Sequence, residues 1–304
     1  MPAYLCLRMT IRQLTDQLTQ NLQAVYPAPE AASVAARLVE HLLGLDGLQR
    51  RMRATEPVPT AAQAQAAAWL PRLLRHEPLQ YVLGTAPFLD MDLLVTPATL
   101  IPRPETEELV QLIVQEQHGP RGRRILDVGT GSGCIPLALA RALPESQVWG
   151  LDVSAEALAV ARHNGQQYAP QVQWLQADIL TETPPGIKPA SLDVLVSNPP
   201  YVRESEQAQM RANVLDFEPH SALFVPDTDP LVFYRRLAAL GTELLMPGGA
   251  IYFEINEALP AETLQLLTER GYRQARWLPD LSGRPRMVRA TWPGRSAVVQ
   301  ADDV

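Results

Sequence analysis

The segment Asn198-Pro199-Pro200-Tyr201 combines residue types that can bind a planar amino or amide group. Two successive prolines hold the backbone extended and remove two backbone donors. The Pro199 carbonyl and the Asn198 side-chain oxygen are then left as acceptors for the two hydrogens of an NH₂ group. The Tyr201 ring can pack against the plane that carries this nitrogen. A proline-rich turn without chemistry is the alternative interpretation.

This arrangement suits methyl transfer to a weakly nucleophilic nitrogen. The lone pair of an amide nitrogen is delocalised into its carbonyl group, so two acceptors are useful to orient the nitrogen and to stabilise the charge that develops. A sulfonium methyl group is already activated, so neither a metal nor a covalent intermediate is required. Asn198, Pro199 and Tyr201 are therefore the candidate catalytic residues. The candidate substrate-binding segment consists of the same three residues and Pro200.

A glycine-rich segment, Asp127-Val128-Gly129-Thr130-Gly131-Ser132-Gly133-Cys134, lies between an expected strand and an expected helix. Alternating glycines let the backbone turn tightly and let a ligand approach closely. A dinucleotide-binding loop has similar spacing and remains open on this evidence. Asp127 favours a methyl donor, because a carboxylate there can hold a water or the cationic amino group of a methionine moiety. Beside a pyrophosphate it would be unfavourable.

Two further acids end the next two expected strands. Asp152 follows the glycine loop by about 20 residues, where a carboxylate can accept hydrogen bonds from ribose hydroxyls of either NAD or S-adenosylmethionine. Asp178 can accept from the exocyclic amine of adenine, and Ile179 can pack on the ring face. The alternatives are a helix N-terminal acid at Asp152 and a surface turn at Asp178 and Ile179.

Strand and helix signals alternate from Arg123 onward. Apolar strands such as 193–196 suit a sheet covered on both faces, and the alternation predicts a doubly wound α/β sheet with right-handed crossovers. The last two strands lack an intervening helix and are expected to pair antiparallel. Strands are expected at 123–128, 147–152, 172–177, 192–197, 249–255, 272–278 and 286–292, and helices at 134–143, 154–168, 230–246 and 259–270.

The first 78 residues are expected to form a small helical domain. Apolar residues recur at three- and four-residue steps from Ile11 to Val25 and from Val34 to Leu45. Residues 60–75 are rich in helix formers, although Pro71 is expected to break or kink this helix. The functional interpretation of this domain is that it grips a partner.

Residues 79–103 are expected to be a linker that contains a β-hairpin. Tyr81-Val82-Leu83-Gly84, Phe88-Leu89 and Leu93-Leu94-Val95 have the composition of short strands. Pro104 suits the first position of a helix that extends to about Gln117. The expected division is thus a docking domain at 1–78, the linker at 79–103, a methyltransferase domain at 104–292 and a flexible tail at 293–304.

Composition narrows the function classes. The 304 residues carry a net charge of −7, which argues against a broad basic surface for nucleic acid. Cys6 and Cys134 are expected to be reduced, which fits an intracellular protein. Neither a membrane span nor a signal peptide is expected. The scattered histidines lack metal-ligand spacing. Met9 is an alternative start, which would make residues 1–8 an extension.

Together these motifs resemble the protein-(glutamine-N5) methyltransferases that modify peptide chain release factors. The resemblance spans roughly residues 10–292 and implies a helical N-terminal domain, a β-hairpin linker and a seven-stranded, Rossmann-like class I methyltransferase domain. Besides the glycine loop and Asn198 through Tyr201, it is carried by Gln80 through Gly84, Ile101 through Glu107, Glu218-Pro219, Phe253-Glu254-Ile255 and Asp280 through Arg284.

The resemblance also implies ligands and a location. S-adenosylmethionine would contact Gly129 through Gly133, Asp152, Ile179 and Asn198. Asn198 through Tyr201 would hold the glutamine of the Gly-Gly-Gln loop in a release factor, which is a component of translation termination in the cytoplasm. Arg103 and Glu105 would lie near the pocket mouth as candidate substrate-binding residues.

Three alternatives remain. A related enzyme could methylate a glutamine of a ribosomal protein, but the helical N-terminal region resembles the release-factor enzymes better. DNA adenine N6-methylation shares the Asn-Pro-Pro-Tyr motif, yet the acidic charge and the lack of an evident target-recognition region argue against it. A non-enzymatic cofactor-binding scaffold would not require Asn198 through Tyr201.

Overall fold

The computed structural model describes residues 9–295, so the expectations for Cys6, for residues 1–8 and for the tail beyond residue 295 lie outside the described residues. The described chain separates into two compact units. One contains the residues up to Gly84 together with Arg211–Phe217, and the other contains Thr85–Met210 and the residues from Glu218 onward. The finer division into docking domain, linker, methyltransferase domain and tail remains a prediction.

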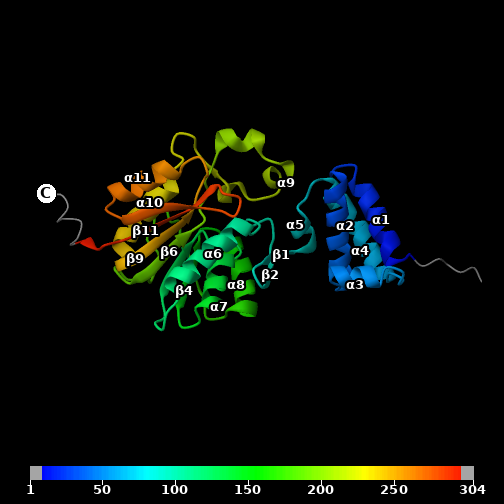
Figure 1. The fold of residues 1–304 in the computed structure, drawn as a ribbon, viewed down its shortest axis with the longest axis horizontal. Coiled ribbons are helices and arrows are strands. Elements are labelled where there is room, and N and C mark those ends of the chain that lie inside the picture. The colour runs from blue at the N-terminus through cyan, green and yellow to red at the C-terminus, as the bar shows by residue number, and fades with distance from the viewer. Residues whose placement is uncertain (1–8, 296–304) are drawn as a thin grey trace, which may run out of the picture. The chain divides into compact units, whose positions relative to one another are not determined.

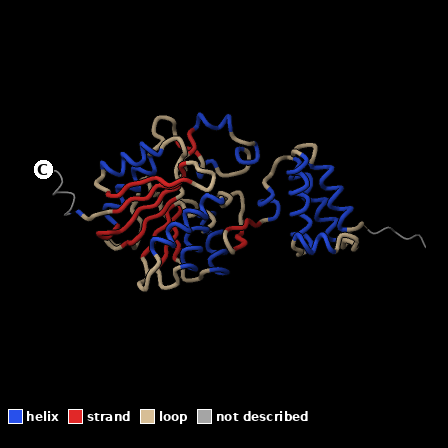
Figure 2. Tube along the Cα trace, viewed as in Figure 1, coloured by secondary structure: helices blue, strands red, loops and turns tan. Residues whose placement is uncertain are grey.

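The first unit is helical, as the apolar spacing predicts (Figures 1 and 2). The Thr10 hydroxyl accepts from the Gln13 backbone, and the Gln13 side chain bonds back to Thr10, which closes a capping box at the start of the first helix. Four apolar residues of that helix, one per turn, are buried against apolar residues of the other helices in this unit. The helices are α1 (Ile11–Leu22), α2 (Ala28–Leu43), α3 (Gly47–Met52), α4 (Thr60–Leu74) and α5 (Leu79–Leu83).

The structure contradicts two expectations for this unit, a break at Pro71 and a strand at residues 81–84, whereas a kink at Pro71 stays a prediction. Helix α4 is not broken at Pro71 but extends to Leu74. Proline removes the bond to the carbonyl four residues earlier and crowds it with its ring. Ala67, which carries this carbonyl, is exposed, so water can satisfy it. The segment Tyr81-Val82-Leu83-Gly84 is not a strand but belongs to α5 and its left-handed Gly84 cap. The guanidinium of Arg72 donates to the carbonyls of Tyr81 and Val82, a tertiary contact that overrides β propensity.

The second unit contains a seven-stranded sheet in the order β10-β11-β9-β6-β3-β4-β5. All neighbours are parallel except β11, which is antiparallel to both β9 and β10, so the doubly wound fold and the final antiparallel pair are confirmed. The strands are β3 (Arg124–Val128), β4 (Gln147–Asp152), β5 (Gln173–Gln176), β6 (Leu192–Ser197), β9 (Leu245–Glu254), β10 (Arg273–Pro279) and β11 (Pro285–Thr291).

Helices cover both faces of this sheet (Figure 1). One apolar cluster packs the sheet against α10 (Val232–Leu244) and α11 (Pro260–Glu269). A second cluster packs the opposite face against α6 (Pro104–Gln117) and α7 (Cys134–Ala142), and α8 (Ala155–Tyr168) contacts α7. Among the described residues, no helix is long and apolar enough to cross a bilayer.

Short elements complete the second unit. The expected β-hairpin is confirmed as β1 (Thr85–Phe88) paired antiparallel with β2 (Met91–Leu94). A pair of two-residue strands, β7 (Val202–Arg203) and β8 (Phe224–Val225), follows β6. The helical turns η1 (Glu204–Gln209) and η2 (His220–Ala222) lie in the segment that connects β7 to β8, and α9 (Ala212–Leu215) of the same segment belongs to the first unit.

The sheet topology determines where the chemistry-bearing residues meet. In the parallel register Val128 of β3 is opposite Leu151 of β4 on one side and Ser197 of β6 on the other. The carboxyl ends of β3, β4 and β6 therefore meet at one edge, next to the point where the strand order reverses. Open α/β sheets bind ligands at such a switch point.

Candidate active site

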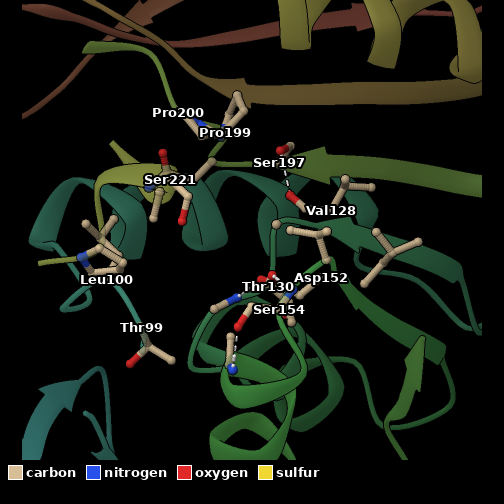
Figure 3. Close-up of a pocket in the computed structure, with 18 of the residues that line it drawn as sticks. Thr99, Leu100, Val128, Thr130, Asp152, Ser154, Ser197, Pro199, Pro200 and Ser221 are labelled. Carbon is tan, nitrogen blue, oxygen red and sulfur yellow. Dashed lines mark hydrogen bonds between the residues drawn. The ribbon is translucent and has the colours of Figure 1, made fainter. Parts of the chain in front are cut away.

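A cavity of about 570 Å³ lies at this edge of the sheet. In Figure 3 the labelled residues of the glycine loop and the end of β4 lie below Pro199 and Pro200, with Thr99 and Leu100 to one side. The walls of the cavity come from residues 98–103, Thr106, the glycine loop, residues 151–157, residues 177–180, residues 197–200, residues 219–222, Phe233 and Leu237. The structure thus assembles segments that are far apart in the sequence.

The glycine loop adopts left-handed backbone at Gly129, Gly131 and Gly133, with φ of 76°, 55° and 83°. A Cβ added at Gly131 would meet nothing within 4 Å, and Gly131 lines the cavity. Gly133 differs, because a Cβ there would lie 2.8 Å from the ring of Trp174, and Gly133 is not one of the described residues that line the cavity. Gly133 therefore allows close packing of the loop, whereas Gly129 and Gly131 face the ligand space.

Asp127 is completely buried at the end of β3. Neither of its carboxylate oxygens has a hydrogen-bond partner among residues 9–295, nor do the hydroxyls of Thr130 and Ser132. Burial raises the pKa of Asp127 to about 7. Thr130 and Ser132 line the cavity, whereas Asp127 is not one of the described residues that do. Buried polar atoms are rarely left without partners, so the orphaned hydroxyls at the wall fit a ligand with hydrogen-bonding groups.

Asp152 of β4 shapes the glycine loop. One carboxylate oxygen accepts from the Gly131 backbone at 2.8 Å, and the other accepts from the Ser154 backbone at 3.0 Å. Asp152 thus lines the cavity and also accepts near the N-terminus of α8, and its contact with ribose hydroxyls stays a prediction. Burial raises the pKa of Asp152, and the hydrogen bonds from Ser154 and Gly131 oppose that rise.

Asp178 and Ile179 both line the cavity after β5. The Asp178 carboxylate accepts from the Leu180 backbone at 3.0 Å, and Ile179 is buried. Arg236 of α10 donates to the Ile179 carbonyl at 2.8 Å and fixes this wall from behind. The structure thus shows the turn at Asp178 and a cavity-lining position for both residues, and their contact with adenine stays a prediction.

Asn198 is held by a buried hydrogen-bond chain. Its Nδ2 donates to the Thr106 hydroxyl at 3.1 Å, and that hydroxyl donates to Oε2 of Glu254 at 2.7 Å. The preceding residue is also fixed, because the Ser197 hydroxyl donates to the Val128 carbonyl at 2.6 Å. Asn198 lines the cavity together with Pro199 and Pro200.

Tyr201 is not one of the described residues that line the cavity. Its hydroxyl donates to Oε1 of Glu254 at 2.9 Å, and its ring packs on the apolar cluster between the sheet and α10. Its carbonyl accepts from Nδ2 of Asn256 at 3.0 Å. Burial, and next the negative charge of Glu254, raise the pKa of the Tyr201 hydroxyl well above its ordinary value.

Arg103 and Glu105 differ in position. Arg103 lines the cavity and donates to Oε1 of Glu218 at 2.6 Å. Glu105 is half-buried in the first turn of α6 and is not one of the described cavity residues. Its negative charge raises the pKa values of Glu108 and Glu254, in each case after burial as the largest cause.

Two residues of the site were not assigned a role from the sequence. Thr106 and Glu254 both lie in family-like motifs, but nothing in the sequence indicates that they share a hydrogen bond across 148 positions. The signal that marks Glu254 is a carboxylate at the end of an otherwise apolar buried strand. Such a group requires specific partners.

Comparisons with known proteins identify the family of this chain. Residues 13–84 match the family model of the PrmC N-terminal domain, and residues 105–216 match that of the Methyltransferase small domain. The release factor glutamine methyltransferase of Bacteroides thetaiotaomicron is 44% identical over 280 residues, which cover 92% of this chain and 99% of the relative. The enzyme of the same name from Flavobacterium psychrophilum is 36% identical over 290 residues, which cover 93% and 100%. The chain belongs to the release factor glutamine methyltransferase family.

Proposed function

We propose that this chain transfers a methyl group from S-adenosylmethionine to the side-chain amide nitrogen of the glutamine in the Gly-Gly-Gln loop of peptide chain release factors. The observation that carries the proposal is the fixed position of Asn198 at the cavity wall, next to Pro199 and Pro200. Its NH₂ group is engaged by Thr106, so its amide oxygen is the acceptor that remains for a ligand.

Residues that line the cavity, together with Asp127 next to that wall in the sequence, divide the binding of the cofactor among them. Asp127 and the orphaned hydroxyls of Thr130 and Ser132 suit the amino acid end, because they lack partners of their own among residues 9–295. Asp152 suits the ribose hydroxyls, and Asp178 with Ile179 suits the adenine. When bound, S-adenosylmethionine supplies an activated sulfonium methyl group.

The chain itself orients the nitrogen that accepts the methyl group. The Asn198 side-chain oxygen and the Pro199 carbonyl would accept the two amide hydrogens, which increases electron density on the nitrogen and stabilises its developing positive charge. Because both acceptors lie on a segment fixed by two prolines, little reorganisation is needed. Tyr201 supports this segment by its bond to Glu254, and its contact with the glutamine remains a proposal.

The helical unit is proposed to dock the release factor while the Gly-Gly-Gln loop enters the cavity. The relatives are named for this substrate, and the match of residues 13–84 to the PrmC N-terminal domain supports a family-specific role for the unit. A cytoplasmic location is part of the proposal, because release factors act on cytoplasmic ribosomes. Direct binding of nucleic acid is not expected at a net charge of −7.

Transfer of a labelled methyl group to a purified release factor tests the proposal. The expected result is incorporation into the wild-type factor and none into a factor whose Gly-Gly-Gln glutamine is replaced by alanine. A ribosomal protein preparation and plasmid DNA serve as parallel acceptors. Unchanged incorporation into the alanine factor, or incorporation only into ribosomal protein or DNA, would exclude the proposed substrate.

A further inference from the structure

Glu254, Thr106 and Asn198 form one continuous chain of hydrogen bonds. Glu254 ends β9, Thr106 lies in the first turn of α6, and Asn198 follows β6. The Thr106 Oγ1 is 2.7 Å from Oε2 of Glu254 and 3.1 Å from Nδ2 of Asn198. Glu254 is 1% exposed and Thr106 is 2% exposed, so water cannot readily replace either partner.

The chain has a direction that follows from the chemistry of its members. An ionised carboxylate only accepts, so the single hydrogen of the Thr106 hydroxyl is donated to Glu254. The oxygen of that hydroxyl can then only accept, and the group that it faces on Asn198 must be the NH₂ end of the amide. The Asn198 oxygen is consequently directed away from Thr106.

The other oxygen of Glu254 accepts from the Tyr201 hydroxyl at 2.9 Å. One buried carboxylate therefore holds both ends of the four-residue segment. It holds Asn198 by way of the Thr106 hydroxyl and Tyr201 by a direct hydrogen bond. In addition, the Tyr234 hydroxyl of α10 donates to the Glu254 carbonyl at 3.0 Å and fixes the backbone that carries this carboxylate.

We propose that Glu254 and Thr106 are positioning residues that keep the amide oxygen of Asn198 directed at the substrate nitrogen. The inference rests on the proposed function, because only a donor such as the glutamine NH₂ group requires an acceptor at this place. If the amide were reversed, Asn198 would present its own NH₂ group to the NH₂ group of the substrate. Two donors cannot form a hydrogen bond with each other, so the nitrogen would lose one of its two acceptors.

The direction of the chain depends on the charge of Glu254. A protonated Glu254 can donate to Thr106, and Thr106 can then donate to the Asn198 oxygen, which reverses the amide. Burial raises the pKa of Glu254, and the hydrogen bonds from Thr106 and Tyr201 lower it. The other charged or titratable groups near this carboxylate, from β11, α6, α10 and α7, are Arg286, Glu105, Tyr234 and Cys134.

Substitution of Thr106 gives the most direct test. Thr106→Val keeps the shape of the side chain and removes its hydroxyl, and we expect kcat to fall about tenfold to a hundredfold. Thr106 lines the cavity but is proposed to act on the ligands through Asn198, so the KM for the release factor and the Kd for S-adenosylmethionine should change much less than kcat. Thr106→Ser keeps the hydroxyl and should restore most of kcat.

Thr263 provides a matched control. It is also a buried threonine, at 0% exposure, and its hydroxyl donates at 2.8 Å to the carbonyl of Leu259, the N-cap residue of α11. Thr263→Val removes a comparable hydroxyl without a connection to Asn198, so kcat should not change. Equal kcat in wild type and Thr106→Val, or the same loss in Thr263→Val, would overturn the inference.

The pH profile of Glu254→Gln gives an independent test. In the wild type, kcat should fall as the pH is lowered through the pKa of Glu254, and this acidic limb should be absent in Glu254→Gln. An acidic limb that is identical in both proteins would overturn the inference. If Thr106→Val does not fold, this profile decides the question alone. A wild-type enzyme that transfers no methyl group to the release factor would instead refute the proposed function.

Discussion

Arg103 and Glu218 form a 2.6 Å ion pair that joins two walls of the cavity. Arg103 ends the wall of residues 98–103, and Glu218 directly precedes the wall of residues 219–222. The second oxygen of Glu218 accepts from the Ile101 backbone at 3.1 Å. The Glu218 side chain is 1% exposed and that of Arg103 is 32% exposed, so this pair is partly shielded from water.

Loss of the Arg103 side chain should destabilise the fold. Arg103→Ala leaves the buried Glu218 carboxylate with its backbone partner alone, and we expect the free energy of unfolding to fall by about 1–3 kcal/mol. Urea denaturation measures this change. The control is Arg235→Ala, which removes an ion pair to Asp229 with side chains 48% and 38% exposed. That pair should contribute about 0–1 kcal/mol, and equal losses in the two variants would contradict the prediction.

The glycines of the loop should separate into two classes. Gly133→Ala puts a Cβ 2.8 Å from the Trp174 ring at φ 83°, so the free energy of unfolding should fall by roughly 1–3 kcal/mol or more. Gly131→Ala meets nothing within 4 Å and should cost about 1–2 kcal/mol from its φ alone. Because Gly131 lines the cavity, the added methyl group would occupy ligand space, so Gly131→Ala should also raise the Kd for S-adenosylmethionine.

Urea denaturation and calorimetric titration with S-adenosylmethionine distinguish the two classes. Gly186→Ala is the control for backbone strain, since Gly186 has φ 76° and also meets nothing within 4 Å. If Gly133→Ala and Gly186→Ala had equal free energies of unfolding relative to wild type, the contact with Trp174 would add nothing to the backbone strain, and the prediction would be wrong.

Asp152→Asn should weaken cofactor binding. The carboxylate already holds the Gly131 backbone at 2.8 Å, and the amide offers only one oxygen for all its present and proposed partners. Hydrogen bonds to a charged group are worth about 1.5–3 kcal/mol, so the Kd for S-adenosylmethionine should rise roughly tenfold to a hundredfold. Titration calorimetry gives the value, with Glu156→Gln as a control that also lines the cavity but makes no backbone contact to the loop among residues 9–295. An unchanged Kd would remove Asp152 from the binding site.

The cofactor-free protein should lose stability as the pH rises from about 4 to about 7 because of Asp127. Burial raises the pKa of Asp127 from 3.8 to about 7, so over this range the folded state binds a proton that the unfolded state releases. Its contribution is complete below the unfolded pKa and is lost as the pH passes the folded pKa. Asp127→Asn should therefore be more stable than wild type at pH 8 by a difference on the order of 1–4 kcal/mol.

Urea denaturation at several pH values tests this linkage, because the difference between the two proteins removes the effect of other titrating groups. The same variant should bind S-adenosylmethionine more weakly, since it lacks the charge proposed for the amino group. A stability difference that does not depend on pH would show that Asp127 keeps an ordinary pKa in the folded chain.

The sequence predicted the sheet well because strand and helix signals there are local. Apolar runs such as 192–197 and the loop glycines need no distant partner to be recognised. Helix α5 was missed, because Tyr81 and Val82 favour strands and the deciding contact comes from Arg72 in the preceding helix. Propensity carries no information about such a partner.

The sequence indicates many of the residues that line the cavity, but not Thr106 and not the hydrogen bonds that connect them. The sequence indicates that Asn198 is chemically important, yet the bond to Thr106 and onward to Glu254 depends on how α6 packs beside β6 and β9. In the same way, the spacing of the loop could not show that Gly133 faces Trp174. Long-range contacts of this kind follow from packing and not from local pattern.

The central claim is that Asn198 directs methyl transfer to one glutamine side chain. Mass spectrometry of the release-factor Gly-Gly-Gln peptide, after incubation with S-adenosylmethionine and either wild type or Asn198→Ala, tests it most directly. With the wild type, we expect one added methyl group on the glutamine side chain. With Asn198→Ala, we expect modification to be about a hundredfold slower. A methyl group on any other residue, or equal modification by the two proteins, would contradict the account.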